Sequence, residues 1–285
     1  MTETVDVTNL KKLNTRPAFH NYIKLIWSRR HFIGFDARAR AFSAEREYFL
    51  GRFWLVIQPL LDAATYGIIF GLLLRTARGV DNFIGYLIIG ITFVGFMTRG
   101  LSSGSGLIKS QRNLIRAFHF PRAAIVISRG VRATIDNALP AVVAVILAII
   151  LQGGKPLNFS IIQVVPIYVL ISVFCTGLIF VSARATAVFP DARVVINFLT
   201  RIWFYLSCVF YSIDRFDHAP RIQALISQNP AYRFVSALRE AILYGNWVSW
   251  REWVVLIFWS GGTFLVGLLY FWQAEGRYVS LESLR

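Results

Sequence analysis

The sequence predicts an all-α, polytopic membrane protein with six transmembrane helices. Hydrophobic residues make up 56% of the 285 residues and charged residues only 16%, a composition that excludes an ordinary soluble domain. Several apolar runs reach the roughly 20 residues that a helix needs to cross a bilayer. The cations behind the net charge of +15 lie mainly between these runs. The positive-inside rule explains this placement, so we expect no nucleic-acid partner.

Residues 1–52 are predicted to form a cytoplasmic N-terminal region. Its apolar side chains from residue 19 onward share one helical face, with basic and polar residues elsewhere: Phe19, Tyr22, Ile23, Ile26 and Trp27. This pattern predicts an amphipathic helix along the membrane surface. A solvent-facing helix packed on protein is the alternative. No cleavable signal peptide is evident, so we expect the first span to direct insertion.

Four arginines lead from this region into the first span: Arg38, Arg40, Arg46 and Arg52. Guanidinium groups at this depth are placed to meet lipid headgroups or the anionic head of a substrate. The requirement to keep this segment in the cytoplasm would explain them equally well.

The six predicted spans form one permease domain over residues 53–272, followed by a cytoplasmic tail at 273–285. They are 53–74, 82–98, 133–151, 161–182, 194–211 and 253–272,. With the N-terminus inside, 21 Lys and Arg residues are cytoplasmic (10 + 7 + 2 + 2 from successive segments) and 8 lie outside. This bias predicts that both termini are cytoplasmic.

The first span carries a charge and a stripe of small residues. Asp62 lies near the expected midplane and marks either a buried polar contact or a pathway,. Pro59 and three small residues after it recur every four positions and share one helix face: Ala63, Gly67 and Gly71. Because small side chains let helices approach closely, we expect this face to pack in a dimer.

The fifth span contains a second intramembrane charge, Arg201. Counted from the cytoplasmic ends of their helices, Asp62 and Arg201 lie about 13 and 10 Å deep. We therefore predict that they form an ion pair. The third span has Asp136, Asn137 and Pro140 near its inner end, where polar groups and a kink require protein or water around them.

The connection 99–132 has seven cations and no acid. A short helix is predicted at 110–118, ending before Pro121. Leu114, Ile115 and Phe118 would face one way and Arg112 and Arg116 another. The segment is a docking helix if a cytoplasmic partner exists and an interfacial loop otherwise.

The outer connection 212–252 contains a capped amphipathic helix that begins at Asn229-Pro230 and stops at Gly245,. Its apolar face is Ala231, Phe234, Val235, Leu238 and Ile242. The segment is predicted to be a surface lid or a re-entrant element. Arg233 and Arg239 would meet phosphate or solvent.

No catalytic or metal site is predicted. Gly153-Gly154-Lys155 is followed by Pro156, so the phosphate-binding pattern fails,. The four histidines lack metal spacing,. Cys175 and Cys208 lie in apolar runs and are expected to be core residues,.

Several motifs resemble those of the type-2 ABC exporter permeases that move polysaccharides and teichoic acids, the Wzm-like family. Leu50-Gly51, Trp54 and Pro59 resemble its LGxxWxxxxP signature. Three later blocks are similar: Asn113 to Arg122 (NLI…FPR), Pro190 to Tyr211 (RD…SPVFY) and Asn229 to Gly245 (NP…R.A.L.G). The sequence departs from the pattern at Pro190, Cys208 and Arg201. The segments FIGYLIIGITF and NLIRAFHFPRA resemble the actinobacterial exporters of lipid-linked galactan most.

The resemblance implies a channel-forming subunit that is not itself an enzyme. It implies a homodimer in the bacterial plasma membrane, with a separate ATP-binding cassette subunit that binds ATP and Mg²⁺, and a lipid-diphosphate-linked glycan as substrate. The residues expected to dock the ATPase are Tyr22, Ile26, Lys109, Arg112, Asn113, Leu114, Ile115, Arg116 and Phe118. Arg38, Arg40, Arg46 and Arg52 would attract the diphosphate.

A channel for glycans is expected to be lined by aromatic side chains, because flat rings suit sugar C–H surfaces. The candidates are Trp203, Phe204, Tyr205, Phe210 and Tyr211, each of which could instead be an ordinary core or interface residue,. An ion-coupled secondary transporter using Asp62 or Asp136, and a membrane-bound glycosyltransferase, are the alternative functions.

Overall fold

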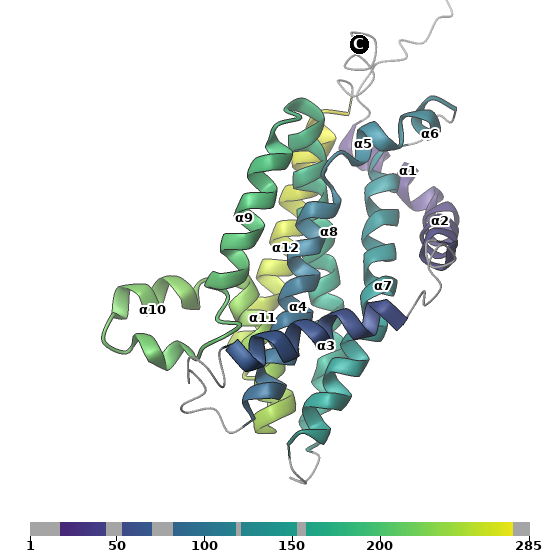
Figure 1. Cartoon of the computed structure of the whole chain (residues 1–285). Coiled ribbons are helices and arrows are strands. Elements are labelled where there is room, and N and C mark those ends of the chain that lie inside the picture. Colours follow the sequence, from purple (N-terminus) through teal and green to yellow (C-terminus); the bar gives the residue numbers. More distant parts are fainter. Residues whose placement is uncertain (1–17, 44–52, 70–81, 118–120, 153–157, 276–285) are drawn as a thin grey trace, which may run out of the picture.

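The computed structural model describes residues 18–43, 53–69, 82–117, 121–152 and 158–275, and within these ranges all regular structure is helical. Five helices stand side by side as a bundle (Figure 1). They are α4 (Phe83–Ser103), α7 (Ala123–Ile150), α8 (Val164–Val188), α9 (Ala192–Leu206) and α12 (Trp250–Gln273). The α-helical class predicted from composition is confirmed for the described residues.

Four described helices are long and apolar enough to cross a membrane: α4, α7, α12, and α8 together with the 3₁₀ turn η2 (Phe159–Gln163) that precedes it. They correspond to four of the six predicted spans. The other two predicted spans contain shorter helices, α3 (Phe53–Tyr66) and α9, so six crossings stay a prediction.

Span boundaries differ most at α7, which begins ten residues before the predicted start at residue 133. Arg129 and Arg132 interrupt the apolar run in this first part of the helix, so the sequence pattern does not predict it as part of the span. Both arginines line a polar cavity, so they extend a buried helix without contacting hydrocarbon.

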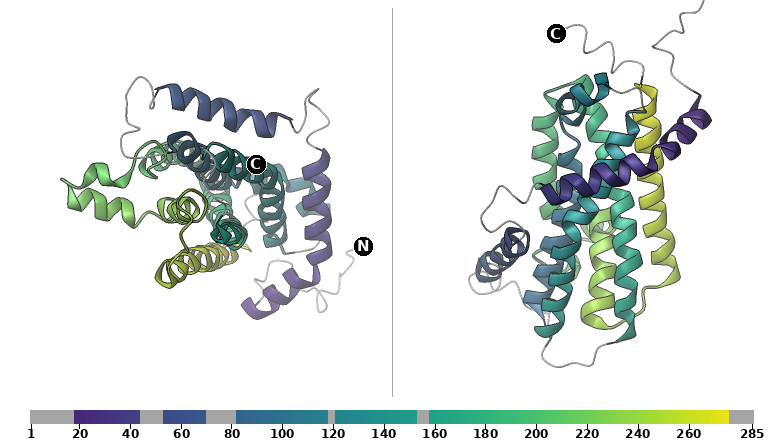
Figure 2. Two further views of the ribbon diagram at one scale, coloured as in Figure 1. Left: turned by 90° about the horizontal axis from the view of Figure 1, so that it is seen from below. Right: turned by 90° about the vertical axis from the view of Figure 1, so that its right-hand side faces the viewer.

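Helix α3 lies across the bundle, not along it (Figures 1 and 2). It contacts α4 and α7, and its 14 residues span only about 21 Å at the usual rise per residue,. This placement differs from the predicted crossing at 53–74, of which residues 70–74 lie outside the described part of the chain.

Six shorter elements lie around the bundle. Helices α1 (Phe19–Ser28) and α2 (Arg30–Ser43) lie across one side of it (Figure 2), and α2 packs on α7. Helices α5 (Leu107–Ser110) and α6 (Arg112–Ala117) occupy one end. After α9 come the 3₁₀ turn η3 (Ile213–Phe216) and α10 (Pro220–Ser227), which project sideways (Figure 1).

Helix α11 (Pro230–Arg239) and the π-helical turn η4 (Glu240–Tyr244) lie inside the bundle. The apolar face predicted from the sequence is buried, with Phe234, Val235 and Leu238 fully enclosed. A surface lid is therefore excluded for this helix. Gly245 ends the segment with a φ of 69°, a conformation that favours glycine,.

Two apolar clusters form the core. The larger joins α4, α8 and α11 around Phe93, Phe174 and Phe234, and the smaller lies near α1 and α5 around Phe180 and Phe271. Helices α8 and α12 cross closely at glycine: a Cβ on Gly177 would lie 2.6 Å from the Thr263 backbone,.

Candidate functional site

The end of the bundle that carries α5 and α6 has a rigid base. Leu107 and Ile108 are buried in the smaller apolar cluster. The turn before them presses on α8, because a Cβ on Gly104 would lie 2.1 Å from Ser182 Oγ. Gly106 then starts α5 with a φ of 75°, so glycine is needed at both positions.

Exposed polar side chains cover this base. Lys109, Arg112 and Asn113 are exposed, whereas Leu114 and Ile115 are half-buried against the smaller cluster. The short helix predicted at 110–118 is confirmed as α6. Phe118 lies outside the described residues, as does the side chain of Arg116. We call the exposed surface of Lys109, Arg112 and Asn113 the α5–α6 platform.

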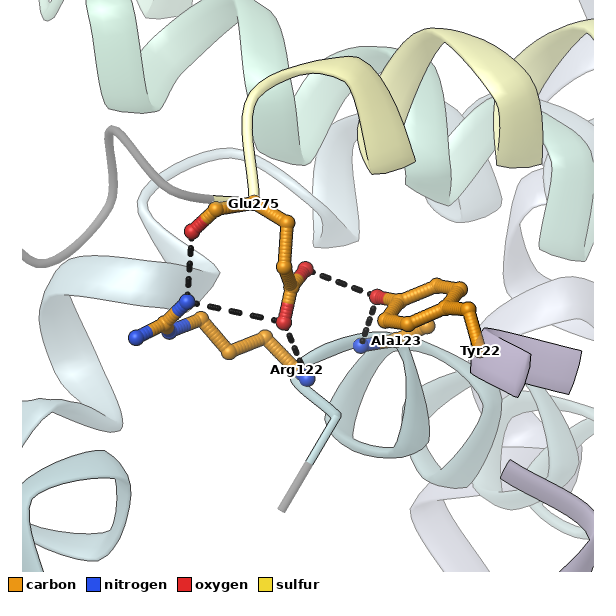
Figure 3. A network of polar contacts seen from close by, with 4 residues as sticks. All are labelled: Tyr22, Arg122, Ala123 and Glu275. Atoms are coloured by element: carbon orange, nitrogen blue, oxygen red, sulfur yellow. Dashed lines mark hydrogen bonds and ion pairs between the residues drawn. The ribbon is translucent and has the colours of Figure 1, made fainter. Parts of the chain in front are cut away.

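A buried hydrogen-bond network joins α1 to the start of α7 and to the residues just after α12 (Figure 3). Tyr22 Oη donates to Glu275 Oε2 at 2.7 Å and accepts from the Ala123 amide at 3.2 Å. Glu275 Oε1 accepts from the Arg122 amide at 3.0 Å, and Arg122 Nη1 lies 3.5 Å from the same oxygen. The network ties α1, α7 and the end of α12 together.

The network corrects one predicted docking residue. Tyr22 is only 1% exposed, so it offers no surface to a partner; it anchors α1 instead. Ile26 is half-buried on the same cluster. The apolar residues Ile23 and Trp27 remain exposed on α1, as an amphipathic interface helix requires.

Glu275 is a functional candidate that the sequence interpretation missed. It lies in the predicted tail and is 6% exposed. Burial raises its pKa, although the Arg122 amide, the Tyr22 hydroxyl and the Arg122 charge all act in the opposite direction,. Its position as the first acid after the last apolar run was the available signal.

Two cavities lie beside α4 and α7. The first, of about 200 Å³, is lined by Arg40, Arg129 and Arg132 among others. The second, of about 460 Å³, lies between α3, α4 and α7. Ser103 and Arg129 line both, so the two cavities meet at these residues.

The predicted diphosphate arginines divide between surface and cavity. Arg38 is exposed on α2, while Arg46 and Arg52 lie outside the described residues. Arg40 lines the first cavity, where its Nε lies 2.7 Å from Asp36 Oδ1 and its Nη2 donates to Gln111 at 3.1 Å. These contacts link α2 to the segment between α5 and α6.

Asp62 and Arg201 do not pair, which corrects the prediction. Asp62 lines the second cavity and acts electrostatically on Arg99. Arg201 is exposed on α9. Two residues at a similar depth in the membrane need not be neighbours. Helix α3 lies across the bundle and places Asp62 beside α4 and α7.

Of the five predicted channel aromatics, Phe204, Tyr205, Phe210 and Tyr211 lie together, whereas Trp203 holds the start of α11. Phe204, Tyr205 and Phe210 stack within 6.0 Å of one another, and Tyr66 of α3 joins them with its ring 4.7 Å from that of Phe210. Tyr205 is the most exposed of the five, because Phe210 is 1% exposed and the other three are half-buried. The Tyr211 hydroxyl donates to the Tyr205 carbonyl.

Trp203 donates from its indole nitrogen to Asn229 Oδ1 at 2.8 Å. The same oxygen caps α11 by accepting from the Ala231 amide, and Asn229 Nδ2 donates to the Leu206 carbonyl. Asn229 therefore joins the end of α9 to the start of α11.

Arg239 meets neither phosphate nor solvent, in contrast to both predicted alternatives. It is 3% exposed and donates to the carbonyls of Tyr86, Cys208 and Val209. Its guanidinium lies 3.2 Å from the centre of the Tyr86 ring. A Cβ on Gly90 would lie 2.6 Å from Arg239 Nη2, so Gly90 makes room for this contact.

Of the three small residues predicted to pack in a dimer, only Gly67 has described surroundings. A Cβ on Gly67 would meet Leu87 of the same chain at 3.9 Å, so this glycine faces α4. The side chain of Ala63 and all of Gly71 lie outside the described residues. The dimer contact stays a prediction.

A family model for the ABC-2 type transporter matches residues 39–243. This range contains both cavities' arginines, the α5–α6 platform and the buried Arg239. The chain belongs to the ABC-2 type transporter membrane family. In this ABC-2 permease the resemblance to Wzm-like proteins is therefore confirmed, and ATP hydrolysis belongs to a separate subunit.

Curated relatives of this ABC-2 permease include O-antigen export system permease proteins named RfbA. One from Myxococcus xanthus is 22% identical over 203 residues, covering 70% of this chain and 75% of the relative. One from Klebsiella pneumoniae is 22% identical over 233 residues, covering 81% and 87%.

The permease has no metal-binding cluster of His, Cys, Asp or Glu within the described residues. Cys175 and Cys208 are both free and buried, as expected for core residues.

Proposed function

We propose that this ABC-2 permease forms the channel of an ATP-driven exporter of lipid-diphosphate-linked polysaccharide. The cargo would move from the cytoplasmic to the outer side of the bacterial inner membrane. Galactan of the cell wall is the cargo that the sequence motifs favour, with O-antigen, capsule and teichoic-acid precursors as the other candidates. The family match, together with relatives named as O-antigen export permeases, supports this cargo class.

The observation that carries the proposal is the α5–α6 platform. Lys109, Arg112 and Asn113 are exposed next to Leu107 and Ile108, which are buried in the same apolar cluster as Tyr22, Ala123 and Phe271. Through this cluster a force applied to the platform would reach α1, α7 and α12, which is what coupling to an ATPase requires. We propose that an ATP-binding cassette subunit, carrying ATP and Mg²⁺, docks here from the cytoplasm.

The complete transporter would contain two copies of the chain and two ATPase subunits, with both termini in the cytoplasm. In this arrangement Ile23 and Trp27 on α1 contact lipid, and Tyr205 contributes to the channel between the copies. Exposure of these side chains supports the assignment.

The test uses the purified chain with its ATPase subunit in proteoliposomes. We expect the lipid-linked glycan to cross the bilayer only when ATP is hydrolysed. Transport driven by an ion gradient without the ATPase would instead support a secondary transporter. Turnover of a sugar donor by the chain alone would support a glycosyltransferase.

The platform itself is tested with matched charge reversals. Arg112→Glu should weaken binding of the ATPase subunit about tenfold, because it replaces an attracted charge by a repelled one. Arg251→Glu is the control, because Arg251 is also an exposed helical arginine but lies in the first turn of α12, whose opposite end joins the smaller apolar cluster. Equal effects of the two changes would remove the platform from the docking surface.

A further inference from the structure

The charges around the two cavities do not cancel within the described chain. Asp36 is paired with Arg40 at 2.7 Å, and Asp136 with Arg132 at 3.3 Å. These two pairs leave Arg99, Arg129 and Asp62 among the charged residues that line the cavities.

Arg129 has no hydrogen bond or ion pair to any described residue, and its Nε is buried without an acceptor. It lies where the two cavities meet. A buried guanidinium N–H without a partner is costly in a folded protein. The two outer guanidinium nitrogens of Arg129 are not buried, so a ligand with acceptor oxygens in the cavity would pair with them and not with Nε.

Arg99 is held in the second cavity by a neutral group. Its Nη2 donates to Asn137 Oδ1 at 2.7 Å, and Asn137 is itself fixed by donating to the Ala133 carbonyl. The Arg99 side chain lines the cavity and is exposed there. The guanidinium is therefore oriented but keeps its positive charge available.

The same cavity has an apolar wall. Ile91, Ala133 and Pro140 supply apolar lining. At about 460 Å³ the cavity falls within the size range of small-molecule sites,.

We infer that this cavity binds a diphosphate diester through Arg99 and Arg129. Two guanidinium groups match the two negative charges of such a diester, and their planar forks suit phosphate oxygens. The apolar wall suits the first carbons of a lipid carrier. This site deepens the proposed function, and rests on it for the identity of the lipid.

Asp62 occupies the cavity from α3 and acts on Arg99. Its negative charge in the same cavity opposes the binding of an anion. Neutralising either arginine should therefore lower the affinity, and neutralising Asp62 should raise it.

The experiment measures binding of inorganic pyrophosphate to the full chain in detergent by calorimetry. Arg129→Gln should weaken binding about tenfold or more, as expected for loss of a charge-assisted contact. Asp62→Asn should strengthen it about threefold by removing the opposing charge. Arg201→Gln, which changes an exposed arginine outside the cavity, should leave binding within about twofold of wild type.

Folding of each variant is checked by its melting temperature, and Arg129→Lys, which keeps the charge, should bind between wild type and Arg129→Gln. Unchanged binding in Arg129→Gln, or weaker binding in Asp62→Asn, would overturn the assignment.

Competition identifies the source of the diphosphate. A polyprenyl diphosphate should displace pyrophosphate at lower concentration than phosphatidylglycerol or inorganic phosphate does. Equal displacement by phosphatidylglycerol or phosphate would show a general anion site and refute the inference. Absence of ATP-driven export with Arg129-dependent binding intact would refute the proposed function alone. Export that Arg129→Gln leaves unchanged would refute this site alone.

Discussion

Replacement of Arg239 by methionine tests whether this buried arginine stabilises the turn at Cys208 and Val209, which follows α9. Arg239 reaches from α11 to the carbonyls of Cys208 and Val209 and to Tyr86 on α4. Cys208 has a φ of 49°, a left-handed conformation that is unfavourable for a side chain larger than that of glycine. The arginine therefore stabilises a strained turn between two helices.

The cost of the change follows from the contacts that are lost. The Tyr86 carbonyl lies inside α4 and keeps its helical partner, whereas the Cys208 and Val209 carbonyls lie outside regular structure. An unsatisfied buried carbonyl costs about 1–3 kcal/mol. Because the Cys208 carbonyl also accepts from the Tyr86 hydroxyl at 3.2 Å, we expect a loss of about 3 kcal/mol in all.

The assay is thermal unfolding in detergent, in which a loss of this size lowers the melting midpoint by about 6–12 °C. Arg233→Met is the matched control, because Arg233 lies on the same helix but pairs with Glu252 near the surface. It should lower the midpoint by about 3 °C at most. An Arg239→Met midpoint equal to that of Arg233→Met would refute the role of the buried guanidinium.

Three further outcomes follow from the same structure. Because burial raises the pKa of Glu275, its contribution to folding is complete below the ordinary carboxyl pKa of about 4.3 and is lost as pH rises through the raised value. The melting midpoint of Glu275→Gln should therefore rise relative to wild type between acidic and neutral pH, and a constant difference would contradict this. Gly104→Ala should destabilise the protein in a chemical-unfolding assay, because its Cβ would lie 2.1 Å from Ser182 Oγ, whereas Gly261→Ala has free space and should not. Cys175 and Cys208 are buried, so a maleimide should label both only after unfolding; rapid labelling of the native protein would show that their surroundings open.

The sequence was sufficient for the elements that depend on local pattern. The apolar face of α11, its start at Asn229-Pro230 and the end of the following turn η4 at Gly245 all follow from spacing, capping and turn chemistry,. The four long apolar helices follow from composition.

Contacts between distant segments were not predictable in this way. Tyr22 and Glu275 are separated by 253 positions, and nothing in either local pattern indicates the other. Arg239 was interpreted as a surface or ligand residue because its enclosing carbonyls come from Tyr86 and from the turn after α9. A buried arginine whose outer nitrogens donate to backbone carbonyls has no sequence signature of its own.

The sequence identifies Asp62 as an intramembrane charge in the first predicted span, and its depth predicts Arg201 as its partner. The structure instead sets Asp62 in a cavity with Arg99 and Arg129. An acid that stabilised the fold by pairing would be expected to have a fixed partner, yet neither arginine forms an ion pair with it among the described residues. The cavity therefore retains cationic groups that are oriented but not neutralised, which is the arrangement that an anionic cargo requires.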